Sequence, residues 1–334
     1  MRALVTGGGG YIGRHVVRQL LDRGDEVVVL GRRAYPEVEA WGARGVQADL
    51  ARDEPDLPRH LEGVDVVFHV AALPPYHAPY AVFEATNVGG TRRILEACRQ
   101  AGVPRLVFTS TPSATFDGTD ACGITEADAP YPERFLTPYA ATKAHAEQLV
   151  LAANGPGLAT TALRPHLVYG PDEPHMLPRV AQRNRAGRLR VIGDGTNRVG
   201  LTYVDTAAAA HLQAADALAE GSANAGKAYF VTDEEPVALW PWLDRFLTGV
   251  GEPPIRGRIG LGPARAVGAV CEALWAVLPL GGEPPMTRFV ATNLATSHWY
   301  DLSGARTDFG FTPVVGGDEG LERTIAWFRA HPIP

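Results

Sequence analysis

The chain opens with Ala3-Leu4-Val5-Thr6-Gly7-Gly8-Gly9-Gly10-Tyr11-Ile12-Gly13. An apolar run leads directly into a glycine-rich turn, and two registers fit the spacing: Gly8-x-Gly10-x-x-Gly13 and Gly7-x-x-Gly10-x-x-Gly13. Glycine lets a backbone approach a pyrophosphate, and the helix that follows presents free amides and a positive dipole end. In a strand, turn and helix context the motif predicts a bound dinucleotide; the alternative is a turn that binds nothing.

Downstream, short β-branched runs alternate with helical periodicity. The predicted strands are 3–6, 27–30, 46–48, 64–70, 105–110 and 159–164, and the predicted helices are 12–23, 88–101 and 139–153. Gly24, Gly102 and the pair Asn154-Gly155 are the expected helix stops. Strands that alternate with helices predict an α/β fold, a Rossmann-type doubly wound parallel sheet covered on both faces.

After Pro165 the pattern becomes irregular and rich in proline and glycine. This change predicts a smaller, mostly C-terminal substrate-binding region. An alanine-rich helix at 205–219 is expected to return to the main sheet. We therefore predict a dinucleotide-binding domain of residues 1–165 with 200–228 returning to it, and a substrate-binding region of residues 166–199 and 229–334.

Composition narrows the class of partner. The 334 residues carry a net charge of −6, with 31 basic and 37 acidic side chains, so no nucleic-acid partner is expected. Cys98, Cys122 and Cys271 lack Cys-x-x-Cys spacing, and the histidines lack metal-ligand spacing, so neither disulfides nor a metal is predicted. A cytoplasmic location is expected, because no signal peptide precedes the first strand.

One apolar stretch, 264–280, is too short to cross a bilayer and is interrupted by Arg265 and Glu272. No transmembrane segment is therefore expected. A helix in the buried core is the favoured interpretation of this stretch. Peripheral contact with a membrane, or with a partner enzyme of the same pathway, is the alternative.

The end of the second predicted strand bears on the cofactor. An acidic residue there would bind the adenosine ribose hydroxyls, but this chain reads Val28-Val29-Leu30-Gly31-Arg32-Arg33. Two guanidinium groups would bind a 2′-phosphate through charge-assisted hydrogen bonds. The sequence favours NADP(H), with NAD(H) as the alternative, unless Arg32 and Arg33 form only a solvated turn.

A candidate catalytic pair follows in the run Thr137-Pro138-Tyr139-Ala140-Ala141-Thr142-Lys143. Thr137 is expected to cap a helix and Pro138 to begin it, which places Tyr139 in the first turn and Lys143 one turn further on the same face. An adjacent ammonium favours the phenolate, so Tyr139 is predicted to exchange a proton with a substrate oxygen. A hydroxyl group should hold that oxygen; we choose Thr111, with Ser113 as the competitor.

With these residues in place, the chain resembles an extended short-chain dehydrogenase/reductase of the 3β-hydroxysteroid dehydrogenase-like branch. The resemblance extends over essentially the whole chain. It is carried by residues 6–13, Asp49-Leu50, His69-Val70-Ala71-Ala72, Asn87-Val88-Gly89-Gly90-Thr91, residues 109–113, Tyr139 with Lys143, residues 164–171, Tyr300-Asp301 and residues 305–311.

The resemblance implies roles for individual residues. Gly7, Gly10, Tyr11 and Ile12 would lie along the pyrophosphate, and Asp49 and Leu50 beside the adenine. The other cofactor positions that it implies are Ala71 and Ala72 at the adenine-side ribose and phosphates, Asn87 at the floor of the pocket, Thr109, Lys143 at the nicotinamide ribose, and Pro165 and Val168 near the carboxamide.

Within this branch, several stretches resemble the β-keto acid reductases of bacterial long-chain olefin synthesis. These are residues 110–113, 131–136, 164–166, 193–197 and 283–289. The implied reaction is NADPH-dependent reduction of the 3-keto group of a 2-alkyl-3-oxoalkanoic acid to the 3-hydroxy acid, with Tyr139 as general acid. Such an apolar substrate suggests pocket residues Tyr76, His77, His166, His175, Met176 and Tyr203.

Three other functions remain open. An NAD(P)-dependent 3β-hydroxysteroid or sterol dehydrogenase would use the same residues in the oxidative direction. A nucleotide-sugar epimerase shares the fold, but epimerases of this kind carry an Arg-Asp pair where this chain has Val199-Gly200. A dinucleotide-sensing regulator would typically lack Tyr139 or Lys143. The resemblance also implies a homodimer formed through helices 88–101 and 139–153.

Overall fold

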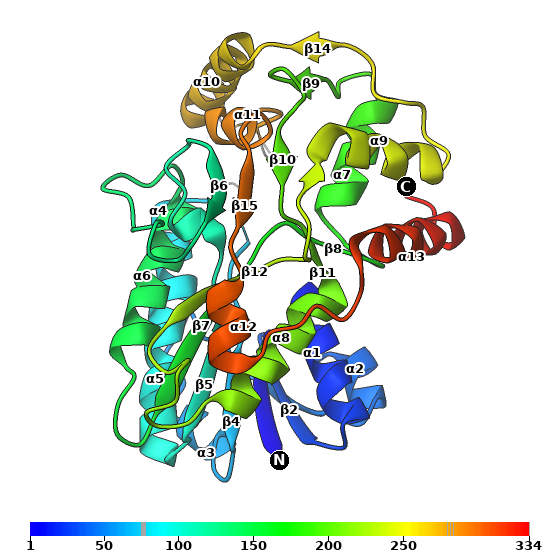
Figure 1. Ribbon diagram of the computed structural model, residues 1–334. Helices are drawn as coiled ribbons and strands as arrows, with labels where there is room; N and C mark the ends of the chain where they lie inside the picture. The colour runs from blue at the N-terminus through cyan, green and yellow to red at the C-terminus, as the bar shows by residue number, and fades with distance from the viewer. Residues whose placement is uncertain (75–77, 279, 281, 283, 334) are drawn as a thin grey trace.

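A computed structural model describes residues 1–74, 78–278, 280, 282 and 284–333. Figure 1 traces the chain from its N-terminus in the lower part of the view. Seven parallel strands form the main sheet in the order β12-β7-β5-β4-β1-β2-β3. Their bounds are β1 Arg2–Thr6, β2 Glu26–Gly31, β3 Arg44–Gln47, β4 Val66–His69, β5 Arg105–Thr109, β7 Ala159–Pro165 and β12 Ala228–Val231.

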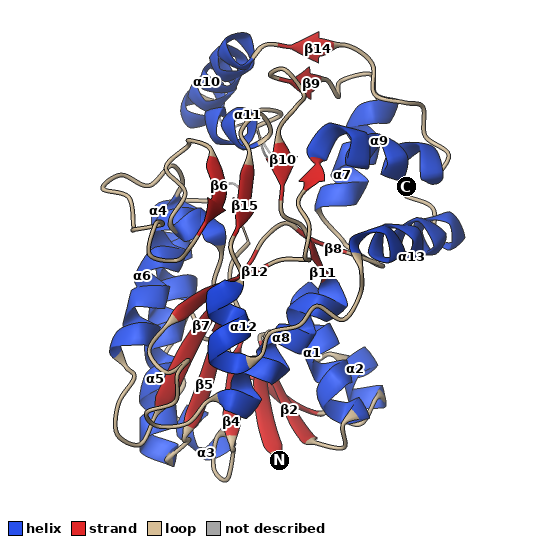
Figure 2. Ribbon diagram, viewed as in Figure 1, coloured by secondary structure: helices blue, strands red, loops and turns tan. Residues whose placement is uncertain are grey.

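Helices cover both faces of this sheet, as Figure 2 shows. Buried side chains of α1 (Tyr11–Asp22), α8 (Val204–Ala217) and α12 (Ser303–Phe309) pack in one core cluster. Those of α3 (Leu57–His60), α5 (Gly90–Ala101) and α6 (Pro138–Ala152) pack in a second cluster. Between β2 and β3 lies α2 (Pro36–Ala40). The predicted doubly wound parallel sheet is confirmed.

The chain reverses its direction across the sheet between β1 and β4. The strand that follows β1 lies on one side of it, and β4 lies on the other, so the loops after these two strands diverge. A crevice at the carboxyl ends of such strands is where doubly wound folds bind nucleotides. Gly24 and Gly102, at φ +86° and +68°, take the left-handed conformation expected of the helix stops.

Shorter strands build a smaller domain above the sheet. One sheet has the order β13-β10-β15-β6, with β13 Val237–Ala238, β10 Arg198–Val199, β15 His298–Tyr300 and β6 Ala121–Ile124. Two further pairs are β8 (Val168–Tyr169) with β11 (Thr202–Tyr203), and β9 (Val191–Ile192) with β14 (Arg258–Ile259). The remaining helices are α4 Tyr80–Phe83, α7 Met176–Arg185, α9 Leu239–Gly249, α10 Leu261–Val277, α11 Arg288–Asn293 and α13 Gly317–Ala330.

Chain segments cross between the two parts in both directions. β12 completes the main sheet and α8 packs on α1, whereas β6 leaves the first 165 residues to pair with β15 of the smaller sheet. The division of the chain given above stays a prediction.

The helix α10 corrects one expectation. Only Ala264 and Gly268 of its 17 residues are buried. The interpretation of residues 264–280 as a core helix was therefore wrong, because apolar periodicity shows that a helix has an apolar face and does not show what covers it.

Candidate active site

The glycine-rich turn is shaped by close backbone contacts. Gly7 has φ +66°, and a Cβ there would lie 2.8 Å from the Cα of Ala71. A Cβ on Gly13 would collide with the backbone of Gly7. Gly10 ends the turn in an extended conformation and has no side chain to cap α1, whose first turn lacks an acidic residue. Its N-terminal amides therefore suit an anion, and these features fit a dinucleotide pyrophosphate.

Aromatic side chains flank this turn. Tyr11, in the first turn of α1, has a buried hydroxyl that finds no hydrogen-bond partner among the residues described. Tyr35 lies over the turn, because a Cβ on Gly9 or on Gly31 would run into its ring. The sequence analysis missed Tyr35. Its place two residues after Arg33 was the only available signal.

Arg32 and Arg33, which follow β2, are both exposed. The Arg33 guanidinium carbon lies 5.8 Å from the ring centroid of Tyr35. Within the described part of the chain, no carboxylate forms an ion pair with either arginine. Both side chains are therefore available to an anion at the end of β2.

The predicted adenine-side residues lie in the loop after β3. The carbonyl oxygen of Leu50 accepts a hydrogen bond of 2.9 Å from Arg93 Nη1 of α5. The backbone N–H of Asp49 donates to Glu54 Oε1 at 2.7 Å. These bonds fix the loop that follows β3 against α5.

A buried hydrogen-bonded chain runs through His69. The Thr91 hydroxyl donates to the Asn87 carbonyl oxygen (2.6 Å), so its oxygen accepts from His69 Nε2 (3.0 Å). His69 Nδ1 then accepts from the Thr6 hydroxyl (2.7 Å), whose oxygen accepts from the Ala71 N–H (3.1 Å). Burial, followed by the charge of Lys143, lowers the pKa of His69 to about 3, so the ring is neutral.

Asn87 extends this network to the catalytic helix. It is 2% exposed, accepts from the Leu73 N–H at 2.7 Å and donates to the Thr142 hydroxyl at 3.1 Å. The loop that carries Ala71 and Ala72 is thereby tied to α6. Asn87 holds the parts of the site together, whatever it contacts in a cofactor.

The start of α6 follows the sequence prediction. The Thr137 hydroxyl accepts from the Ala140 N–H at 3.1 Å, and Pro138 begins the helix. Tyr139 lies in the first turn, with the Phe83 ring edge-on at 6.5 Å. Burial raises the pKa of Tyr139 to about 12, and a hydrogen bond from Thr111 only partly offsets this. The expected lowering of the phenol pKa was wrong for the protein alone, because desolvation is the larger effect.

Lys143 lies one turn further along and is 2% exposed. Its Nζ donates to the carbonyl oxygen of Thr109 at 2.6 Å and lies 4.0 Å from the ring centroid of Phe108. Burial lowers the pKa of Lys143 to about 7, while Glu147 acts in the opposite direction. The ammonium is anchored at the end of β5 and loses its proton near neutral pH.

The hydroxyl side chains of residues 109–113, at and after the end of β5, have different hydrogen-bond partners. The Thr109 hydroxyl donates to His211 Nε2 at 2.7 Å, since His211 Nδ1 donates to the Ala207 carbonyl oxygen. Thr111 instead contacts Tyr139, and its hydroxyl oxygen accepts from the Ser113 N–H at 3.2 Å. Ser113 lies in the short turn Pro112–Ala114 that follows.

A buried ion pair continues the face of α6 that carries Tyr139 and Lys143. Glu147, fully buried, accepts from Arg164 Nε at 2.9 Å and Nη2 at 2.6 Å, and from the Tyr131 hydroxyl at 2.6 Å. This pair joins α6 to the end of β7, where Pro165 follows. The sequence analysis missed it, although Glu147 repeats the four-residue spacing of Tyr139 and Lys143.

Beyond Pro165, the chain turns sharply at Leu167, which has φ +42°, and reaches the half-buried Val168. His166 is buried; its Nδ1 donates to the Gly200 carbonyl oxygen at 2.5 Å. The His298 ring packs edge-on against it, with centroids 4.7 Å apart. Burial and His298 lower the pKa of His166, so it cannot serve as a cation for a substrate carboxylate.

The other predicted substrate residues that the structure describes are His175, Met176 and Tyr203. Tyr76 and His77 lie outside the described residues. His175 is exposed before α7, and Met176 packs beside the buried cluster of the smaller domain. Tyr203 is 2% exposed within that cluster and packs against Tyr169, so it offers little surface to a ligand.

A cavity of about 330 Å³ lies between α10, α11 and the two loop segments 117–118 and 135–136. In the sequence, Gly118 follows the Thr111 segment and Leu136 precedes Tyr139, but Thr111, Tyr139 and Lys143 do not line this cavity. Its lining consists of Asp117, Gly118, Phe135, Leu136, Arg265, Glu272, Arg288, Phe289 and Thr292. The sequence did not indicate this cavity, because α10 and α11 reach it only through tertiary packing.

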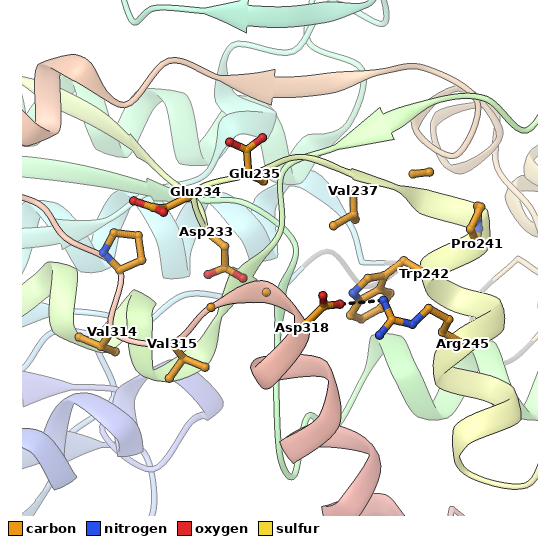
Figure 3. A pocket seen from close by; sticks show the side chains of 14 residues that line it. Asp233, Glu234, Glu235, Val237, Pro241, Trp242, Arg245, Val314, Val315 and Asp318 are labelled. Atoms are coloured by element: carbon orange, nitrogen blue, oxygen red, sulfur yellow. Dashed lines mark hydrogen bonds and ion pairs between the residues drawn. The ribbon is translucent and has the colours of Figure 1, made fainter.

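A larger cavity, of about 580 Å³, lies elsewhere, between α9 and the start of α13. Figure 3 shows Asp233, Glu234 and Glu235 on one side and the ion pair of Arg245 with Asp318 on the other. The catalytic residues do not line it. Its carboxylates make it unsuited to an anionic dinucleotide or keto acid.

The structure also bears on metal binding and on membrane insertion. Over the described residues, no group of three or more His, Cys, Asp or Glu side chains is arranged to hold a metal ion. No helix in the described ranges is both long enough and apolar enough to cross a membrane.

Comparison with known proteins gives a family and close relatives. The model of the 3-beta hydroxysteroid dehydrogenase/isomerase family matches residues 4–254. The 2-alkyl-3-oxoalkanoate reductase of Stenotrophomonas maltophilia is 47% identical over 328 residues, 98% of this chain and 99% of that protein. The decarboxylating sterol-4-alpha-carboxylate 3-dehydrogenase of Mus musculus is 35% identical over 336 residues, 98% of this chain and 91% of that protein.

Solved structures show the same fold. MoeE5 in complex with UDP-glucuronic acid and NAD has a TM-score of 0.73 and 29% sequence identity, and the match covers 99% of this chain and 100% of that one.

Proposed function

The chain belongs to the 3-beta hydroxysteroid dehydrogenase/isomerase family, and from this we propose that it reduces the 3-keto group of a 2-alkyl-3-oxoalkanoic acid with NADPH. It is an NAD(P)-dependent oxidoreductase that acts on CH–OH or C=O groups. The substrate class rests on the reductase from Stenotrophomonas maltophilia, which matches nearly the whole of both chains. The reductive direction is supported by Tyr139, which keeps its proton beside Thr111 until strongly alkaline pH.

We propose that the dinucleotide lies along the glycine turn, with Gly7, Gly10, Tyr11 and Ile12 at the pyrophosphate. Asp49, Leu50, Ala71 and Ala72 would line the adenosine half, and Pro165 and Val168 the nicotinamide half. Arg32 and Arg33 support NADP(H), because both are exposed at the end of β2 and neither forms an ion pair with a carboxylate among the residues that the structure describes. When bound, the reduced nicotinamide supplies the hydride for the carbonyl carbon.

The protein's own residues then handle the substrate oxygen. Thr111 donates a hydrogen bond to that oxygen and Tyr139 delivers a proton to it. The Lys143 ammonium, fixed by the Thr109 carbonyl oxygen, stabilises the phenolate that forms. Asn87 and the ion pair of Glu147 with Arg164 keep α6 in register with the sheet.

The 330 Å³ cavity is the proposed site for one alkyl chain. Phe135, Leu136 and Phe289 supply apolar walls. Arg265 lines the same cavity, and it is the cation that we propose for the substrate carboxylate. Neither His166, which follows β7, nor His298 of β15 can bind the carboxylate as a cation, because burial lowers the pKa of both.

The test is to follow NADPH and NADH oxidation with three substrates: a 2-alkyl-3-oxo acid, a 3-ketosteroid and a UDP-hexose. Turnover of the keto acid with NADPH is expected to exceed the others. Tyr139→Phe should lower kcat about 100- to 10,000-fold while the dissociation constant for NADPH changes little. Intact turnover by Tyr139→Phe would remove the phenol from the reaction.

A sterol dehydrogenase is the second candidate, favoured by the 35% identity to the Mus musculus enzyme. It would show as preferred turnover of the steroid. The epimerase alternative is weakened, because Val199 is fully buried between β13 and β15 and provides no cation for a sugar nucleotide.

A further inference from the structure

The ring of Tyr35 bridges the glycine turn and the end of β2. A Cβ on Gly9 would collide with Cδ1 and Cε1, along one edge of the ring. A Cβ on Gly31 would lie 2.5 Å from Cε2 and 2.6 Å from the hydroxyl oxygen, on the opposite edge. Only glycine at both positions leaves room for the ring, so a single side chain rests on two segments more than 20 residues apart.

Both segments belong to the adenosine half of a dinucleotide site. In a Rossmann fold the glycine turn approaches the pyrophosphate, and the residue at the end of the second strand contacts the adenosine ribose. Gly31 is the last residue of β2. Because the Tyr35 ring rests on Gly9 and Gly31 together, an adenosine ribose that approaches this part of the site must displace it.

Packing alone keeps the ring in place. Residues 32–34, 36 and 37 are exposed, whereas Tyr35 is half-buried and packs against the core cluster that includes α1. Among the described residues its hydroxyl has no hydrogen-bond partner. The carbonyl oxygen of Tyr35 accepts from the Glu39 N–H at 3.1 Å, a bond that rotation of the side chain does not break. The ring can therefore turn toward solvent while α2 stays folded.

We propose that Tyr35 is a gate to the adenosine subsite, which the ring closes by packing on Gly9 and Gly31 and opens by rotating toward solvent. The inference rests on the dinucleotide site of the proposed function and does not depend on the keto acid. A gate lowers the apparent affinity for a ligand by the fraction of protein in the open state. Rotation of the ring leaves Arg33, now 5.8 Å from its centroid, at the end of β2 to meet the incoming cofactor.

Rapid-mixing kinetics test the gate. NADPH is mixed with the purified protein without keto acid, and nicotinamide fluorescence gives the association and dissociation rate constants. Because the closed ring affects only the free protein, Tyr35→Ala should raise the association rate constant about 10-fold and change the dissociation rate constant less than about twofold. Tyr35→Ser should behave in the same way. Tyr35→Phe keeps the ring and should match the wild type.

A second aromatic residue of α2 supplies the matched control. Trp41 lies at the C-terminal end of that helix, with the guanidinium carbon of Arg18 4.5 Å from its ring. Trp41→Ala removes an aromatic side chain beside the same helix without uncovering Gly9 or Gly31. Its association rate constant for NADPH should equal that of the wild type.

Fragments of the cofactor locate the effect. In calorimetry, Tyr35→Ala should tighten the binding of 2′,5′-ADP about 10-fold and leave that of nicotinamide mononucleotide unchanged. NADH association should rise by the same factor as NADPH association, because the ring covers the ribose whichever cofactor approaches. Equal binding of NADPH and NADH by the wild type would refute the proposed preference for NADP(H), while the result for the gate would stand on its own.

Three results would overturn the proposal. The first is weaker NADPH binding by Tyr35→Ala through faster dissociation, which would mean that the ring stacks on the bound adenosine. The second is an association rate constant of Tyr35→Ala and Tyr35→Ser equal to that of the wild type. The third is an equal rise for Trp41→Ala, since loosening of α2 would then be sufficient.

Discussion

Replacing Lys143 by methionine is expected to stabilise the cofactor-free protein at neutral pH. The ammonium is 2% exposed, and burial lowers its pKa from an ordinary 10.5 to about 7. Methionine fills a similar volume and carries no charge to desolvate. The same substitution should abolish keto reduction, so the site would gain stability and lose function together.

The size of the effect follows from the contacts of Lys143. At about 1.4 kcal/mol per pKa unit, the lowered pKa corresponds to about 5 kcal/mol below pH 7. Methionine also leaves the Thr109 carbonyl oxygen without its donor, which costs about 1–3 kcal/mol, and loses about 1 kcal/mol at the Phe108 ring. The expected net gain at pH 6 is about 1–3 kcal/mol.

The sign of this difference depends on pH. The folded protein holds the Lys143 proton more weakly than the unfolded chain does, so the destabilisation is complete below pH 7. It shrinks as the pH rises from about 7 to 10.5 and is absent above that range. The variant should therefore be more stable than the wild type at pH 6, and equal or less stable near pH 10.5.

Urea unfolding of both proteins without cofactor, at pH 6, 8 and 10, measures the difference. Lys227→Met is the matched control, because its side chain is 54% exposed in an ion pair with Asp308. It should change stability by less than about 1 kcal/mol, with no such pH dependence between pH 6 and 10. The reasoning fails if Lys143→Met is less stable than the wild type at pH 6, or if the difference is the same at pH 6 and pH 10.

Three further outcomes are expected. The rate of keto reduction should fall as the pH rises through about 7, because Lys143 loses its charge there while Tyr139 keeps its proton; a flat profile from pH 6 to 9 would contradict this. Thr111→Val should lower kcat about 100-fold and Ser113→Ala less than 10-fold, and steady-state kinetics with the opposite ranking would assign the oxygen contact to Ser113. Glu147→Gln should lower the free energy of unfolding by about 3–5 kcal/mol, since Arg164 is left buried without its carboxylate; Glu147→Leu/Arg164→Met should recover most of that loss in urea unfolding.

Local chemistry allowed the main features to be predicted from the sequence. The glycine turn, the cap at Thr137 and the position of Tyr139 each depend on neighbouring residues, and the structure has the turn, the cap and the helix where they were expected. The alternation of strands and helices was sufficient to predict the parallel sheet, because parallel strands must be joined by crossover connections, which are usually helical.

The features that were missed depend on distant parts of the chain. Arg164 reaches Glu147 from another strand, and Tyr35 covers a turn more than 20 residues earlier. The pKa of Tyr139 reflects how much protein surrounds the ring, which spacing along one helix does not reveal. The exposure of α10 likewise depends on the absence of a neighbour in the described structure, and no pattern within the helix encodes that.

The strand β6 links the two parts of the molecule mechanically. It lies in the sequence between the Thr111 segment and Tyr139, yet it is hydrogen-bonded to β15 of the smaller sheet. A displacement of that sheet would therefore move both catalytic segments at once, because residues 115–120 connect β6 to the Thr111 segment and residues 125–137 connect it to the start of α6. The position of the smaller sheet therefore sets the positions of the oxygen-holding hydroxyl and of the proton donor together.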